Sequence, residues 1–161
     1  MHYFGKSLKA GKVGENVLRV YFTDVVQLDG RESDFVLKDS VHRIELKTDY
    51  YDEYRTPNFF MERYSNIESQ SPGGPWQALE KGSDYFCYLF IRNLSLYVFD
   101  TAALVTRLNY LVDESAVRCA TIPNIKWDTF GYLVKRSLLE PLGIKQLRHG
   151  ETYLFKDLLT C

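Results

Sequence analysis

Two acidic residues and a lysine, Asp34, Glu45 and Lys47, lie close together in the sequence. They lie in SDFVLKDSVHRIELKTD, residues 33–49, which has the pattern of two short strands joined by a turn. Side chains alternate between the two faces of a strand, so Glu45 and Lys47 share one face of the second strand. Two carboxylates and an ammonium group on one surface can bind a metal ion and stabilise charge on a phosphate.

The register of this hairpin decides whether the two carboxylates meet. With a two-residue turn at residues 39–40, Val36 pairs with Arg43, and Asp34 then lies directly opposite Glu45. Directly opposed residues have Cβ atoms about 5 Å apart, so the carboxylates would repel and one would tend to hold a proton. Mg²⁺ removes this repulsion, because it takes oxygen ligands and typically binds through one or two carboxylates plus a substrate phosphate. A different loop length would move the pairing, and Glu-x-Lys is also a common pattern on an exposed strand.

The elements before and after the hairpin must position these groups. A four-residue step of apolar residues predicts an amphipathic helix over residues 13–25, with Glu15 at the edge of its apolar stripe. VVQL is a β-like stretch between this helix and the hairpin. TDYYDEYRTP after the hairpin is expected to be a loop, and the aromatic-rich NFFMERYS, residues 58–65, a strand.

The second half of the chain alternates helices and strands. NIESQSPGGP has the composition of a loop, and PWQALEKG that of a short helix with Pro in its first turn and Gly after its end. DYFCYLFI is typical of a buried strand, LSLYVFD of a further strand, and Asp100 is expected to cap the helix TAALVTRLNYLV. GYLVKRSLLEPLG indicates a strand turning into a short helix, and ETYLFKDLL a closing helix. This order predicts a single α/β domain over residues 1–161, with a mixed central β-sheet flanked by helices.

Composition limits the class of protein. The chain has 161 residues, 45% of them hydrophobic and 15% aromatic, which is typical of a globular domain. No apolar run approaches the roughly 20 residues of a membrane helix, and no signal-peptide core is evident, so we expect no membrane partner. The three cysteines (Cys87, Cys119 and Cys161) form no CxxC pair, which favours free thiols in a reducing cytoplasm. HExxH and GxSxG motifs are absent from the sequence.

Charge is unevenly distributed along the chain. The net charge of −1 counts mildly against a DNA-binding domain, since such domains are often basic. Residues 1–19, however, carry four basic residues against the single acid Glu15. Three of them, Lys6, Lys9 and Lys12, recur every third residue, so a helix would display them together as candidate DNA contacts.

The order of these motifs resembles the PD-(D/E)XK nuclease superfamily. Asp34, followed by Glu45-Leu46-Lys47 in a second strand and preceded by a helix that bears Glu15, is the arrangement on which the resemblance rests. The pair formed by Glu15 and the glycine before it is similar to that of the Holliday-junction-resolvase and phage-nuclease branches. The residue before Asp34 is a serine and not the proline of the motif.

A later stretch, TPNFFMERYSNIESQSPGGPWQALEKGSDYFCYLF, is similar to phage-type members. Its features are an asparagine-led aromatic strand ending near a glutamate, a Pro/Gly loop, and a strand that opens with Asp-Tyr. The resemblance covers residues 6–100, which would form a restriction-endonuclease-like nuclease core. Residues 101–161 would be a C-terminal extension of the same domain.

The resemblance implies a role for each matched residue. Asp34 and Glu45 would hold Mg²⁺ or Mn²⁺ with help from the Leu46 carbonyl, and Lys47 would be the catalytic lysine. Glu15 would be an outer ligand of the metal or of water, although an ordinary polar position at the helix edge explains it equally well.

Two accessory residues are less specific. Gln77, in PWQALEKG, resembles a helix glutamine of several branches of the superfamily but also fits a plain helix surface. Glu62, in NFFMERYS, is expected near the site, or else on the solvent side of its strand.

These observations predict a cytoplasmic, metal-dependent DNA endonuclease that hydrolyses phosphodiester bonds by nicking or by cutting branched DNA. If the chain is phage-encoded, the compartment would be the host cytoplasm. The C-terminal ETYLFKDLL is apolar enough to cover a second copy, which leaves a homodimer open. The alternatives are a catalytically silent nuclease-like module that binds nucleic acid, and a protein-interaction module.

Overall fold

The first helix ends earlier than the sequence pattern indicates. The structure, a computed structural model, describes residues 4–29, 33–39 and 41–160, with the backbone alone for residues 4–10. Helix α1 (Phe4–Tyr21) stops before Val25, which begins strand β1 (Val25–Gln27). The expected helical end at residue 25 was therefore wrong. Asp24 accepts hydrogen bonds from the backbone of Phe155 and Lys156, at 2.7 and 3.1 Å, and these hold the turn after α1.

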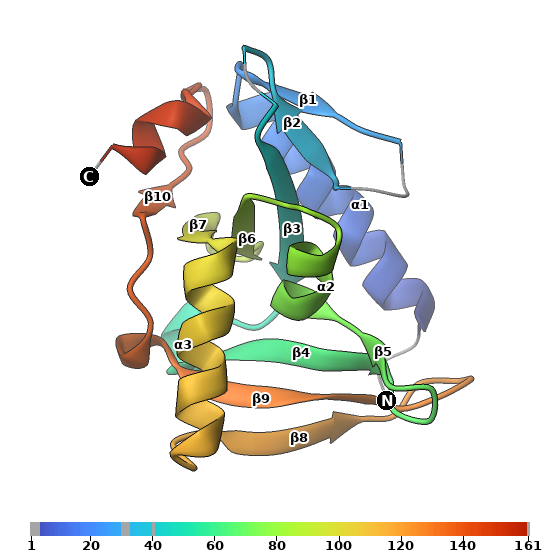
Figure 1. Cartoon of the computed structure of the whole chain (residues 1–161). Coiled ribbons are helices and arrows are strands. Elements are labelled where there is room, and N and C mark those ends of the chain that lie inside the picture. The colour runs from blue at the N-terminus through green and yellow to red at the C-terminus, as the bar shows by residue number, and fades with distance from the viewer. Residues whose placement is uncertain (1–3, 30–32, 40, 161) are drawn as a thin grey trace.

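A mixed six-stranded sheet forms the centre of the fold, which confirms the expected α/β class (Figure 1). Its order is β1, β2 (Phe35–Leu37), β3 (Arg43–Asp49), β6 (Tyr85–Phe90), β7 (Ser95–Asp100) and β10 (Gly143–Gln146). Strands β3 and β6 are parallel and the other neighbours are antiparallel. The long apolar run of β6 is buried on both faces of the sheet, as the sequence predicts.

A second sheet, which the sequence did not predict, runs across the direction of β3 (Figure 1). It has four antiparallel strands in the order β5 (Ser71–Pro72), β4 (Asn58–Asn66), β9 (Thr129–Lys135) and β8 (Arg118–Ile122). The predicted aromatic strand is β4, and the expected loop after it contains the two-residue β5. Strand β9 is the strand expected in GYLVKRSLLEPLG, whereas β8 and β10 were not expected.

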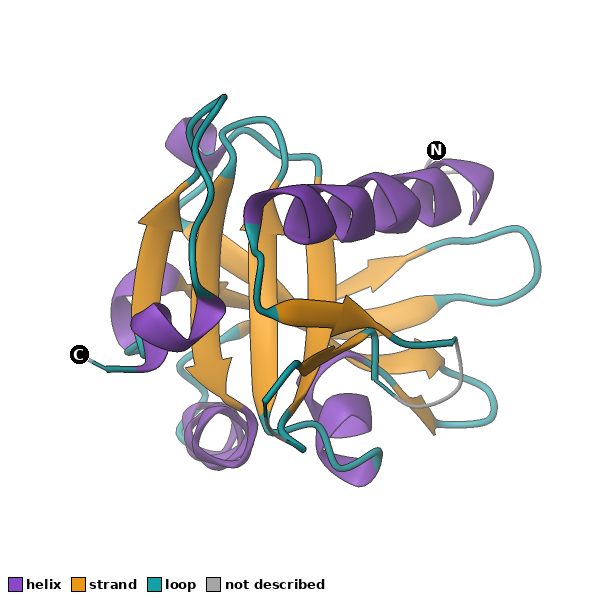
Figure 2. Ribbon diagram, turned by 90° about the horizontal axis from the view of Figure 1, so that it is seen from above, coloured by secondary structure: helices purple, strands orange, loops and turns teal. Residues whose placement is uncertain are grey.

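Helices cover both faces of the six-stranded sheet. Figure 2 shows α1 lying across the strands. Leu18 in the last turn of α1 and Phe22 just after it pack in one buried cluster with Cys87 and Leu89 of β6. The neighbouring residues of β6, which alternate to the other face, pack with α2 (Gly74–Glu80), α3 (Thr101–Asp113) and the second sheet.

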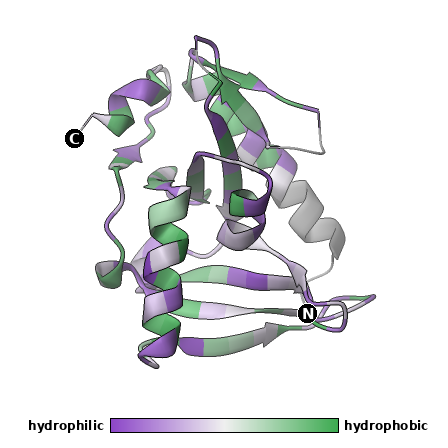
Figure 3. Ribbon diagram, in the orientation of Figure 1, coloured by the Kyte–Doolittle hydropathy of each residue, from purple (hydrophilic) through white to green (hydrophobic). Residues whose placement is uncertain are grey.

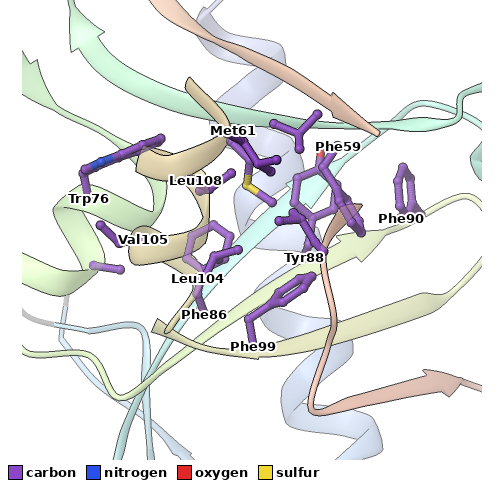
Figure 4. Packing of buried hydrophobic residues seen from close by; sticks show 14 residues of the cluster. Phe59, Met61, Trp76, Phe86, Tyr88, Phe90, Phe99, Leu104, Val105 and Leu108 are labelled. Atoms are coloured by element: carbon purple, nitrogen blue, oxygen red, sulfur yellow. The ribbon is translucent and has the colours of Figure 1, made fainter. Parts of the chain in front are cut away.

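Six of the fourteen buried residues in this second cluster are aromatic (Figure 4). Phe59 lies 4.8 Å from Tyr88 and 5.7 Å from Phe99, measured between ring centroids. Hydrophobic and hydrophilic bands alternate along α3, which is typical of a helix that buries one side (Figure 3). The aromatic cluster joins the two sheets and so fixes β4 relative to β3 and β6.

Helix ends follow the sequence signals. Asp100 caps α3, because its Oδ1 accepts a hydrogen bond from the Ala103 N–H at 2.8 Å. Pro75 lies in the first turn of α2, and Gly82 after it has a φ of +78°. Short 3-10 helices occur at η1 (Glu53–Arg55), η2 (Arg136–Leu138) and η3 (Phe155–Leu159). No helix in the described part of the chain is long and apolar enough to cross a membrane.

The chain after Asp100 is built into both sheets. Strand β10 pairs with β7 in the central sheet, and β9 pairs with β4 in the second. Residues 101–160 therefore complete the two sheets and also supply α3, η2 and η3.

Candidate active site

The hairpin of β2 and β3 has the register that the sequence predicts. Val36 pairs with Arg43 and Phe35 with Ile44, and the same register continued by one residue sets Asp34 opposite Glu45. Strand alternation places Glu45 and Lys47 on one face of β3. The two carboxylates are therefore brought together by backbone pairing, whereas Ser40 of the expected turn lies outside the described residues.

Asp34 is held at the start of β2 by the backbone of the opposite strand. The Leu46 N–H donates a hydrogen bond to Asp34 Oδ2 at 2.8 Å. Just before it, the buried Ser33 hydroxyl lies 2.5 Å from that of Ser83 in the α2–β6 loop, which ties this end of β2 to the loop. Burial raises the pKa of Asp34, and the Leu46 hydrogen bond and the charge of Lys81 oppose this rise.

Glu45 is a mostly buried carboxylate with incomplete hydrogen bonding. Its side chain is 15% exposed, and among the described residues its buried Oε2 has no hydrogen-bond partner. Its Oε1 lies 3.7 Å from the Lys81 ammonium nitrogen. Burial, and then the negative charge of Asp34, raise the pKa of Glu45 to about 7. Such a group would be stabilised by a further cation.

Glu15 is the third carboxylate that interacts with this pair. Burial and the charge of Asp34 raise its pKa, and its Oε2 accepts a hydrogen bond from Gln27 Nε2 at 2.8 Å. The charge of Glu15 in turn contributes to the raised pKa of Glu45. We call Glu15, Asp34 and Glu45 the carboxylate cluster.

A close contact between helix and strand positions Glu15. Gly14 packs against Thr48 of β3 so tightly that a Cβ at residue 14 would lie 1.8 Å from Thr48 Oγ1. A larger residue at position 14 would push α1 away from β3. Gly14 thus lets α1 approach the strand that carries Glu45.

Lys47 follows Glu45 by two residues on β3 and forms no ion pair with the cluster among the described residues. It sits opposite Tyr88 in the parallel pairing of β3 with β6, and its Nζ is 6.0 Å from the centroid of the Phe60 ring on β4. In the described part of the chain it forms no ion pair with Asp34 or Glu45. Its ammonium group therefore lies where the central sheet meets the second sheet.

Lys81, which the sequence pattern did not mark as a site residue, contacts the cluster through Glu45. Lys81 is the C-cap residue of α2, and Gln77 lies four residues before it. Residues four apart share a helix face. That spacing was visible in PWQALEKG, but only the packing of α2 reveals which carboxylate the lysine meets.

The other residues predicted to belong to the site are Glu62, Gln77 and the three N-terminal lysines. The Glu62 carboxylate packs against Gly73, where a Cβ would lie 2.3 Å from its Oε1. Among the described residues, no hydrogen bond or ion pair links the side chains of Glu62 or Gln77 to the carboxylate cluster. Lys12 is exposed, and its charge acts to lower the pKa of Glu15. The side chains of Lys6 and Lys9 lie outside the described residues.

The donor set fits a hard divalent cation bound together with a substrate. Asp34, Glu45 and the Leu46 carbonyl are all oxygen ligands, as Mg²⁺ and Mn²⁺ prefer. Glu45 Oε2, which has no hydrogen-bond partner among the described residues, offers such an ion an oxygen ligand. Within the described ranges, no group of three or more His, Cys, Asp and Glu side chains is arranged to hold a metal by itself. Mg²⁺ commonly uses only one or two carboxylates and completes its shell with water and phosphate.

Comparisons of the chain with models of protein families, with curated proteins and with solved structures give no match. The PD-(D/E)XK assignment therefore stays a prediction that rests on Glu15, Asp34, Glu45 and Lys47.

Proposed function

We propose that this chain is a metal-dependent DNA endonuclease with a restriction-endonuclease-like core of PD-(D/E)XK type. The observation that carries the proposal is the pairing of Asp34 opposite Glu45, with Glu15 close enough to raise the pKa of Glu45. A purely structural hairpin gains nothing from this arrangement, because like charges opposite each other destabilise strand pairing. Repulsion that persists in a fold is more easily explained by a cation that binds there.

Asp34, Glu45 and the Leu46 carbonyl would hold Mg²⁺ or Mn²⁺. When bound, the ion supplies positive charge to the scissile phosphate and makes a nearby water more acidic. The Leu46 N–H keeps Asp34 Oδ2 oriented, so the carboxylate does not have to be ordered when the ion binds.

Two neighbouring residues would act on the substrate. Glu15 would orient the attacking water as a hydrogen-bond acceptor, and its raised pKa makes it a better proton acceptor than an exposed glutamate. Lys47 would place its ammonium against the charge that grows on the phosphate during the reaction. The position of Lys47 near Phe60 leaves its ammonium group free of both carboxylates.

One such site cuts one strand at a time. A monomer is therefore expected to nick duplex DNA, and a double-strand break or a symmetric cut of a four-way junction would need two copies of the site.

Nicking of supercoiled plasmid in Mg²⁺ tests the proposal. The unmodified chain should convert supercoiled to open-circular DNA, and EDTA should stop the reaction. Asp34→Asn should abolish cleavage yet preserve or tighten DNA binding, because it removes a negative charge near the phosphate. Asp113→Asn, a matched change at the exposed end of α3, should cut at the normal rate.

The outcomes separate the proposal from its alternatives. Full cleavage by Asp34→Asn at saturating Mg²⁺ would refute the site. DNA binding in EDTA by a chain that never cuts would favour a silent nucleic-acid-binding module. A chain that neither cuts nor binds DNA would favour a protein-interaction module.

A further inference from the structure

Lys81 brings a positive charge into the proposed metal site from outside the hairpin. It follows α2 directly, and its Nζ lies 3.7 Å from Glu45 Oε1. Its side chain is 28% exposed and that of Glu45 is 15% exposed, so solvent only partly screens the contact. The charge of Lys81 favours the ionised forms of both Glu45 and Asp34.

Two cations would share the Glu45 carboxylate. A divalent cation held by Asp34 and Glu45 would lie close to the ammonium that already contacts Glu45 Oε1, and like charges this close repel strongly. Lysine can relieve the conflict, because it has a flexible four-carbon stem and a compact head that is readily hydrated. The partial exposure of Lys81 gives that head a route to water.

We propose that Lys81 is a resident counter-ion of the site: its ammonium stabilises the Glu45 carboxylate in the metal-free protein and leaves Oε1 when a divalent cation binds. This inference rests on the metal site of the proposed function and adds a control on its occupancy. Lys81 acts through Glu45 and is thus a positioning residue. It differs from Lys47, whose ammonium contacts neither carboxylate of the described pair.

The counter-ion role predicts an unusual gain on removing a lysine. A lysine that merely stabilises the fold would, when replaced, leave metal binding unchanged or weaker. A lysine that competes with the metal would, when replaced by an uncharged residue, leave Glu45 more available. Lys81→Met should therefore bind Mn²⁺ about tenfold more tightly, which is about a third of the effect of two unit charges about 4 Å apart near a protein surface.

Calorimetric titration of Mn²⁺ into the DNA-free chain measures this effect. Lys81→Arg keeps the charge and should bind within about twofold of the unmodified chain. Lys156→Met removes an exposed lysine of η3 and controls for net charge. Glu45→Gln removes a ligand of the site and should abolish the binding.

Tighter binding by Lys81→Met alone supports the inference. Equal or weaker binding by Lys81→Met overturns it, and if Glu45→Gln still abolishes binding, the proposed metal site is unaffected. Unchanged binding by Glu45→Gln would instead refute the metal site, and the inference with it. A crystal structure of the unmodified chain with Mn²⁺ decides the matter without a variant: a Lys81 ammonium still at Glu45 Oε1 beside the bound ion would contradict displacement.

Discussion

The ionised carboxylate of Glu45 lies in surroundings that lower the stability of the fold. It is mostly buried, it faces Asp34, and one of its oxygens lacks a hydrogen-bond partner among the described residues. A buried carboxylate beside a second carboxylate destabilises the fold even with the Lys81 ammonium 3.7 Å from its Oε1, and such features persist where function requires them. The difference in pH dependence between the unmodified chain and a Glu45 variant therefore reports on this residue.

Glu45 should make the protein less stable as the pH rises from about 4.5 to about 7. Below 4.5 the group is protonated in both states and contributes nothing. Between the two values the folded chain keeps a proton that the unfolded chain has lost, so the free energy of unfolding falls. Glu45→Gln removes this loss, so it should be stabilising at pH 8 by at most about 3 kcal/mol and nearly neutral at pH 4.

Urea unfolding at pH 4, 6 and 8 checks this prediction. Glu68→Gln, a change at an exposed position after β4, should show no such trend. A Glu45→Gln chain whose stability gain is the same at all three values would rule out a raised pKa as its source.

Lys47 should matter for the chemical step more than for binding. Its ammonium shares the face of Glu45 without pairing to it, so it remains available to charge that develops in the transition state. Lys47→Ala should lower the single-turnover cleavage rate by a factor of about 100 or more. If only DNA affinity fell while that rate held, the lysine would be a phosphate anchor.

The sequence predicted the residues of the hairpin better than their surroundings. Strand alternation and a two-residue turn were enough to set Asp34 against Glu45, because both are local rules. Lys81 could not be found in this way, since its contact depends on how α2 packs against β3. Glu62 and Gln77 precede Lys81 in the sequence. Among the described residues, however, neither side chain forms a hydrogen bond or an ion pair with the carboxylate cluster.

The approach of α1 to β3 depends on Gly14. Gly14→Ala should destabilise the chain by roughly 1–3 kcal/mol, because the new Cβ would meet Thr48 Oγ1 at 1.8 Å and something must shift. Gly11→Ala is the matched control: nothing lies within 4 Å of its Cβ, so it should be neutral or stabilise by up to about 1 kcal/mol. Thermal unfolding of the two variants measures the difference.

A second substitution separates this clash from other effects of alanine. In Gly14→Ala/Thr48→Ala the contact with Oγ1 is gone, so part of the lost stability should return. Thr48→Ala alone should cost little, since among the described residues Thr48 Oγ1 is buried without a partner. Equal stability of Gly14→Ala and Gly11→Ala would contradict the close contact.

Strands with a clear apolar pattern were predictable and the others were not. Strands β2 and β3 are neighbours in the sequence, and a tight turn joins β6 to β7. The apolar patterns of these segments and the turn residues between them therefore identify them as strands. Strand β8 pairs with the next strand, β9, but three of its five residues are exposed, so its sequence lacks a clear apolar period. Strand β10 has only four residues and pairs with the distant β7. The second sheet was missed because the pairing of β4 with β9 joins segments far apart in the chain.

DNA binding by the whole molecule should depend on the N-terminal lysines. The backbone of α1 sets Lys6, Lys9 and Lys12 at three-residue steps, and the charge of Lys12 reaches Glu15. Each lost contact with a duplex phosphate should reduce the log–log salt slope of binding by about 0.9. A triple alanine variant should therefore lose up to about 2.7 of that slope.

A matched variant distinguishes a located contact from net charge. Lys38, Lys135 and Lys156 are exposed elsewhere on the chain, and replacing them by alanine removes the same charge. Fluorescence anisotropy over a range of salt concentrations gives both slopes. The same change of slope in the two variants would show that α1 is not the DNA-binding helix.

The central claim is that Asp34 binds the metal that cuts DNA, and a change of metal preference tests it most directly. Thiolate is a softer ligand than carboxylate and binds Mg²⁺ poorly, but it accepts Mn²⁺ or Cd²⁺ better. The measurement is plasmid nicking by Asp34→Cys in each metal beside the unmodified chain. If Asp34 is a ligand of the metal, Asp34→Cys should fail to cut in Mg²⁺ and regain cleavage in Mn²⁺ or Cd²⁺. Undiminished cleavage by Asp34→Cys in Mg²⁺ would contradict this claim.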